Sequence, residues 1–88
     1  MPAVSVVLTG ALSPTQSSDL QCEGRTVGEV LEDCCRIRPA LRSRIFRADG
    51  TLWVSVFVNG RSINQREGLE TPVVEGDEVR VMSAIAGG

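Results

Sequence analysis

The chain has 88 residues, of which 42% are hydrophobic, and a formal net charge of −2. This length suits one small domain and excludes a cleft between two domains, and the slightly acidic balance disfavours nucleic-acid binding, which usually needs a basic excess. No segment approaches the roughly 20 consecutive apolar residues that a membrane-spanning helix requires. The first ten residues, MPAVSVVLTG, contain no basic residue and alternate like a strand, unlike a signal peptide. These features predict a soluble cytoplasmic protein.

The absence of histidine and lysine limits the chemistry available to the chain. There is no histidine, and all nine basic residues are arginine. The chain therefore lacks the commonest general base and metal ligand, and it has no lysine for a Schiff base or for isopeptide-linked chains. Its three cysteines, Cys22, Cys34 and Cys35, are too few for a four-ligand zinc site and show no CxxC spacing. We predict no metal site and interpret the cysteines as small apolar core residues, with a redox or catalytic role as the alternative.

The first half of the chain predicts two strands and a helix. Alternation over residues 3–8 indicates a strand, a polar loop covers residues 9–19, and residues 20–24 fit a short second strand. Thr26 and Glu29 have the spacing of a capping box at a helix start, and Pro39 should end that helix. Its apolar positions follow the stripe of an amphipathic helix, namely Val27, Val30, Leu31, Cys34 and Cys35.

The second half predicts two further strands. After a short turn or extended piece at residues 40–46 and a turn at 48–50, the segment LWVSVFVNG at residues 52–60 has the strongest strand pattern in the chain. Residues 61–78 are predicted to be mostly loop, and EVRVMSAI at 78–85 forms the last strand. One helix covering one face of a mixed sheet of four to five strands is an α+β, β-grasp arrangement. We expect a single β-grasp domain over residues 1–84 and a flexible tail over residues 85–88.

The segment FVNG, followed by GLETPVVEGDEVRVMSAIAGG, resembles the closing half of the ubiquitin-like sulfur carrier proteins. This family includes the small subunit of molybdopterin synthase, the thiamine-pathway carrier and the carrier of cysteine biosynthesis. The front half, GRTVGEVLEDCCRIRPALRSRIFRADG, follows the same family pattern. The chain departs from it at Ser83-Ala84-Ile85, where many members carry Pro-Pro-Val or Pro-Ala-Val. The ending AIAGG and the length of the segment from Asn59 to Gly76 are most similar to the cysteine-biosynthesis type.

The resemblance implies a ubiquitin-like fold and a carrier function without catalytic residues or a bound cofactor. An ATP-dependent activating enzyme would adenylate the carboxylate of Gly88, and a sulfur donor would convert it to a thiocarboxylate. Gly87 and Ala86 would thread the tail into the partner's active site. Further partners implied are a sulfur-accepting synthase and a metalloprotease that releases product. The alternatives are the molybdopterin synthase subunit, a ubiquitin-like protein modifier, and a binding module that is never activated.

The alternation of the strands also predicts where partners dock. The face under the helix should take Val4, Val6, Leu8, Val54, Val56, Val58, Val79 and Val81. The opposite face then receives Val7, Trp53, Phe57 and Met82. Large apolar side chains without a covering helix are typical of a protein-binding surface, so we expect these four residues to form a partner-binding patch. The alternative is that the loop at 40–50 or the loop at 61–75 covers them.

Overall fold

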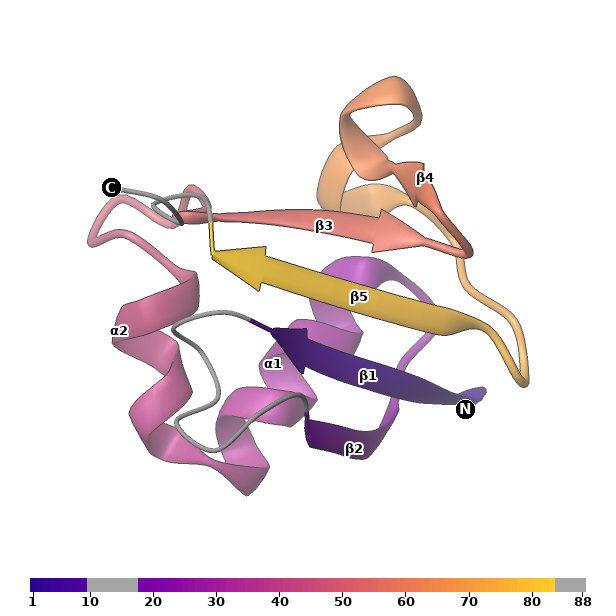
Figure 1. Ribbon diagram of the computed structural model, residues 1–88, viewed down its shortest axis with the longest axis horizontal. Coiled ribbons are helices and arrows are strands. Elements are labelled where there is room, and N and C mark those ends of the chain that lie inside the picture. The colour runs from indigo at the N-terminus through magenta and orange to yellow at the C-terminus, as the bar shows by residue number, and fades with distance from the viewer. Residues whose placement is uncertain (10–17, 84–88) are drawn as a thin grey trace.

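The computed structural model describes residues 1–9 and 18–83, which form a mixed five-stranded sheet with helices on one face (Figure 1). The strands are β1 (Ala3–Thr9), β2 (Ser18–Glu23), β3 (Val54–Val58), β4 (Arg61–Ser62) and β5 (Glu78–Ser83). Their order across the sheet is β2-β1-β5-β3-β4. Strands β1 and β5 lie side by side in the centre and run parallel, and the other neighbouring pairs are antiparallel. This is the β-grasp architecture that the sequence predicts.

The main helix begins and ends where the sequence signals place it. α1 spans Val27–Ile37, and the Thr26 hydroxyl accepts a hydrogen bond from the Glu29 N–H at 3.2 Å. The Glu29 carboxylate accepts from the N–H of Arg25 at 2.8 Å, so the capping box closes one residue before the N-cap. Pro39 stops the helix because it has no N–H and disfavours helical geometry in the preceding residue. A 3₁₀ turn at Pro39–Leu41 then leads into α2, a single turn at Arg42–Ile45.

The core lies between the sheet and these helices. All eight strand positions predicted for the covered face are at most 9% exposed, and the whole α1 stripe is buried against them. Leu41 and Ile45 close the core beside α2. Neither helix in the described part of the chain is long and apolar enough to cross a membrane.

The structure differs from the sequence prediction mainly at strand ends. β2 begins at Ser18, two residues earlier than expected, and the segment predicted to be loop contains β4 and two 3₁₀ turns, Ile63–Gln65 and Gly68–Glu70. β3 begins at Val54 because Leu52 pairs with Phe46 in an isolated bridge and the Trp53 N–H donates to the Ile45 carbonyl at 2.8 Å. Most of the predicted first loop, and Ile85 of the predicted last strand, lie outside the described residues.

Candidate functional site

The last described strand, β5, ends where β1 ends and β3 begins. We call this end of the sheet, at Thr9, Val54 and Ser83, the exit edge, and it is the candidate site. Ser83, the end of β5, pairs with Val54 at the start of β3, while Met82 pairs with Thr9 at the end of β1. Figure 1 shows the ends of β1 and β5 and the start of β3 at this same side of the molecule. The predicted site residues Ala86, Gly87 and Gly88 lie outside the described residues. The chain therefore leaves the described fold between two strands of the sheet.

The face of the sheet opposite the helices carries a smaller apolar surface than the sequence predicts. The Met82 side chain is 41% exposed and Phe57 is half-buried. In the sheet register, Arg80 lies opposite both Phe57 and Val7. Met82 and Phe57 are therefore diagonal neighbours, with a cation beside them rather than a continuous apolar patch.

Val7 does not belong to an exposed patch, and the prediction for this residue is wrong. Its side chain is only 9% exposed, although it points away from the core cluster. Val7 lies on the central strand β1, with Asp19 and Arg80 as its register neighbours on the two sides. Val7 is thus flanked by a paired strand on each side, and its short side chain keeps little exposed surface.

Trp53 lies at the exit edge, just before β3, in a loop with its own hydrogen bonds. The guanidinium of Arg47 lies over the Trp53 ring at 4.6 Å from its centroid, and the ring stays 40% exposed. The Arg47 N–H donates to the Thr51 carbonyl at 2.7 Å, and Asp49 accepts from the hydroxyl and the N–H of Thr51 at 2.7 and 3.0 Å. These donors lower the pKa of Asp49. The loop thus presents a supported aromatic ring beside the end of β5.

The opposite end of β5 is held by the two motifs that carry the family resemblance. Asn59 has a φ of 51° and Gly60 a φ of 87°, as a tight left-handed turn requires. The Asn59 amide donates to the Asp77 carboxylate at 3.0 Å and accepts from the Glu78 N–H at 3.0 Å, and the Asp77 carboxylate also accepts from the Val74 N–H at 2.9 Å. We call Asn59, Asp77 and Glu78 the turn clamp. It lies at the far end of β5 from Ser83 and fixes the start of that strand.

No group of three or more potential metal ligands occurs within residues 1–9 and 18–83. All three cysteines are free and buried, as expected for core residues. What sequence reasoning missed is the contact between Cys22 on β2 and Cys34 on α1, because the two lie 12 residues apart on different elements. Within the described residues, the candidate site therefore consists of the strand ends at Thr9, Val54 and Ser83 and the exposed apolar side chains beside them.

Comparisons with known proteins agree with this arrangement. Residues 6–88 match the model of the ThiS family. A putative sulfur carrier protein from Archaeoglobus fulgidus is 38% identical over 72 residues, which cover 80% of this chain and 82% of the relative. Among solved structures, the small archaeal modifier protein 1 (SAMP1) from Methanosarcina acetivorans has a TM-score of 0.81 at 28% identity, covering 100% of this chain and 98% of its own. CysO from Mycobacterium tuberculosis has a TM-score of 0.79 at 26% identity, covering 93% and 99%.

Proposed function

Because the chain belongs to the ThiS family of ubiquitin-like sulfur carriers, we propose that it carries sulfur as a thiocarboxylate on its last residue, Gly88. The observation that carries this proposal is that the family match runs to residue 88, so the Ala86-Gly87-Gly88 ending lies inside the matched segment. The described fold supports it by delivering the chain to a sheet edge at Ser83.

The proposed chemistry starts from an unreactive group. A terminal carboxylate has a pKa of about 3.5 and is ionised at neutral pH, which makes it a poor acylating agent. One carboxylate oxygen attacks the α-phosphorus of ATP on the activating enzyme, and pyrophosphate leaves. Hydrosulfide or an equivalent sulfur donor then attacks the acyl carbon of Gly88 and AMP leaves with its bonding electrons. The product is a thiocarboxylate, and the carrier is a cosubstrate rather than an enzyme.

Glycine at the last two positions suits this role for steric reasons. The carboxylate must reach an ATP site inside the partner, and a Cβ on Gly87 or Gly88 would widen the segment that enters. Five residues follow Ser83, and a fully extended segment of that length spans at most about 18 Å. That reach leaves the folded body outside the partner's channel.

We propose that the activating enzyme docks on the exit edge. Met82 and Trp53 are the exposed large apolar side chains there, at 41% and 40%, and half-buried Phe57 is a diagonal neighbour of Met82 in the sheet. Aromatic and methionine side chains are favoured anchors of protein interfaces. Docking on these residues would aim the chain end after Ser83 at the partner's active site. Because activation consumes ATP, we place this cycle in the cytoplasm.

Two tail variants test the activation step. Deleting Gly88, or changing Gly87→Val, should abolish ATP–pyrophosphate exchange by the cognate activating enzyme and leave the melting temperature unchanged. Val74→Ala serves as the matched control, because it alters an exposed residue at the other end of β5 without altering the tail or the docking site, and it should preserve exchange. Exchange at the original rate with either tail variant would contradict the proposal.

A second candidate function is attachment to other proteins as a modifier. The similarity to SAMP1, whose name describes it as a modifier protein, favours it. The activation step would be the same, and the adenylated Gly88 would then acylate a lysine of a target protein. This chain has no lysine, so it could not itself be extended into lysine-linked chains. Higher-mass conjugates in cell extracts would indicate the modifier, and an oxygen-for-sulfur exchange on the free chain would indicate the carrier.

The sulfur acceptor is chosen by the partner enzyme, and we propose cysteine biosynthesis or a related pathway that installs sulfur. The support is the AIAGG ending and the length between Asn59 and Gly76, which resemble the cysteine-biosynthesis carriers. Transfer of labelled sulfur from the loaded carrier to an activated serine derivative, by the cognate synthase, would test this choice. Transfer only to a pterin precursor would favour the molybdopterin synthase subunit instead.

A further inference from the structure

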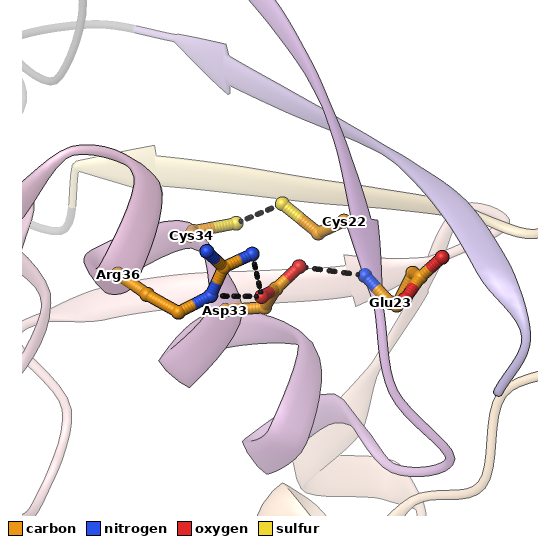
Figure 2. Close-up of polar contacts among 5 residues, drawn as sticks. All are labelled: Cys22, Glu23, Asp33, Cys34 and Arg36. Atoms are coloured by element: carbon orange, nitrogen blue, oxygen red, sulfur yellow. Dashed lines mark hydrogen bonds and ion pairs between the residues drawn. The ribbon is translucent and has the colours of Figure 1, made fainter.

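Two buried thiols meet between the edge strand β2 and helix α1 (Figure 2). The sulfurs of Cys22 and Cys34 are 2.8 Å apart, and the two residues are 1% and 0% exposed. A disulfide bond is about 2.04 Å long, so small side-chain movements would bring these sulfurs to bonding distance. Among the described residues, the sulfur–sulfur contact involves only this pair, although Cys35 is also buried.

Hydrogen bonds of the neighbouring residues join β2 to α1 beside the two thiols. Asp33 on α1 accepts a hydrogen bond from the Glu23 N–H on β2 at 2.9 Å, directly beside the cysteine contact (Figure 2). Arg36 donates to the other Asp33 oxygen at 2.9 Å and fixes the orientation of that carboxylate. The backbone donor from Glu23 and the Arg36 charge lower the pKa of Asp33, so it stays ionised at neutral pH. Strand β2 is therefore linked to α1 by two consecutive contacts, one buried and one at the surface.

The two thiols are chemically unequal. The hydrogen bond between the two thiols lowers the pKa of Cys22. The same bond, together with burial, raises the pKa of Cys34. Burial also raises the pKa of Cys35. Because the thiolate is the reactive form of cysteine, Cys22 is the thiol of the pair that is suited to react first.

We propose that Cys22 and Cys34 are a site of reversible oxidation that forms an intramolecular disulfide between β2 and α1. With hydrogen peroxide as oxidant, the Cys22 thiolate attacks one peroxide oxygen, the O–O bond breaks, and hydroxide leaves and takes up a proton. The sulfur of Cys34, losing its proton, then attacks the Cys22 sulfur of the resulting sulfenic acid, and a second hydroxide leaves to become water. Two thiols are oxidised and one peroxide is reduced to two waters.

Access to these buried sulfurs depends on β2. The strand lies at one end of the sheet and pairs only with β1, so local opening of this edge exposes Cys22 without unfolding the central strands. β1 separates β2 from β5, which carries Met82 of the proposed docking site, and from β3. Oxidation should therefore leave binding to the activating enzyme unchanged, and this inference stands or falls independently of the proposed function.

The test is the intact mass of the reduced full-length protein after treatment with hydrogen peroxide, followed by alkylation in denaturant. We expect the loss of two hydrogen atoms, one alkylated thiol remaining, and recovery of all three thiols after dithiothreitol. The oxidised protein should melt several degrees higher, because the cross-link restricts the unfolded chain. Trypsin without reductant should release residues 1–25 linked to residues 26–36.

Matched variants identify the partners. After peroxide treatment, Cys35→Ser should still lose two hydrogen atoms, and no thiol should remain for alkylation. Cys34→Ser and Cys22→Ser should form no intramolecular disulfide. Oxygen addition to the wild-type chain without hydrogen loss, a bond that survives in Cys34→Ser, or three alkylatable thiols after peroxide would each overturn the proposal. If Cys22→Ser and Cys34→Ser fail to fold, the tryptic map of Cys35→Ser still decides it, because Cys34 is then the single cysteine of residues 26–36.

Discussion

The two ends of β5 are built in opposite ways. At its start, the turn clamp of Asn59, Asp77 and Glu78 satisfies backbone and side-chain groups within the chain. At its end, the described side chains include the exposed Met82 and, across the sheet edge, the exposed Trp53. Polar groups paired with each other favour one conformation, whereas exposed apolar groups gain free energy only when a partner covers them. One end of the strand is held by hydrogen bonds within the chain, and the other carries the exposed apolar side chains that we propose as the docking site.

The family motifs can be divided in the same way, into those that hold the fold and those that we propose to carry the function. The FVNG and GDEV segments contact each other at the turn clamp, far along β5 from the exit edge. They are structural signatures, because they fix where β5 begins and hence where it ends. In the function that we propose, the activity depends instead on the last residues and on Met82 and Trp53. Disrupting each end should therefore damage a different property of the protein.

The largest expected effect on stability comes from removing the clamp carboxylate. Asp77→Ala leaves the Val74 N–H and the Asn59 amide without their acceptor, which should cost about 2 kcal/mol of unfolding free energy. Chemical denaturation measures this loss. The affinity of the folded variant for the activating enzyme should stay within about twofold of wild type, within RT ln 2 or about 0.4 kcal/mol. An unchanged denaturation midpoint would show that the clamp does not hold β5.

A charge at the exit edge should weaken binding to the activating enzyme and leave the stability of the fold nearly unchanged. Met82→Glu should weaken binding to the activating enzyme at least tenfold, or about 1.4 kcal/mol, with little change in melting temperature, because the side chain is already 41% exposed. The matched control is Val74→Glu, which places the same charge on a 63% exposed apolar residue beside the turn clamp. Isothermal titration calorimetry on both variants compares the two ends directly. If both substitutions weakened binding to the activating enzyme equally, the two ends of β5 would not differ in docking.

A smaller effect should follow from unstacking Trp53. Arg47→Ala removes the guanidinium from above the ring, an interaction at an exposed site that contributes about 0.5–1 kcal/mol. We expect binding to the activating enzyme to weaken by roughly threefold, which corresponds to about 0.65 kcal/mol. Arg47→Lys, which keeps the charge, should lie between the variant and the wild type. Tighter binding by Arg47→Ala would show that the stack holds Trp53 away from the partner.

The smallest effect concerns acid. Donors from Thr51 hold the pKa of Asp49 below its ordinary value of 3.8, so its contribution to the loop is present above the unfolded pKa and is lost as pH falls through the folded one. Trp53 is the single tryptophan of the chain, and its fluorescence should change with a midpoint below 3.8. Asp49→Asn should flatten that transition while circular dichroism stays native. A wild-type midpoint above 3.8 would contradict the assignment.

The sequence predicted the core better than the surface. Period-2 alternation placed all eight inner-face residues correctly, and the α1 stripe is buried as expected, because burial of many apolar groups outweighs local effects. The alternation predicted the wrong exposure for Val7. The pattern assigns a side chain to a face of the sheet, but it does not give the exposed fraction that the neighbouring side chains leave. It placed Trp53 on a strand because the bridge between Phe46 and Leu52 depends on a contact that spacing does not encode. The contact between Cys22 and Cys34 was beyond sequence reasoning for the same reason.

The most direct test of the central claim is the intact mass of the protein isolated from its native cells with an N-terminal affinity tag. We expect part of the free chain to carry one oxygen-for-sulfur exchange, and fragmentation should place it at Gly88. The same protein lacking Gly88, isolated in parallel, should show no exchange. An exchange located elsewhere in the chain, or present equally in the protein lacking Gly88, would contradict the claim that this residue carries the sulfur.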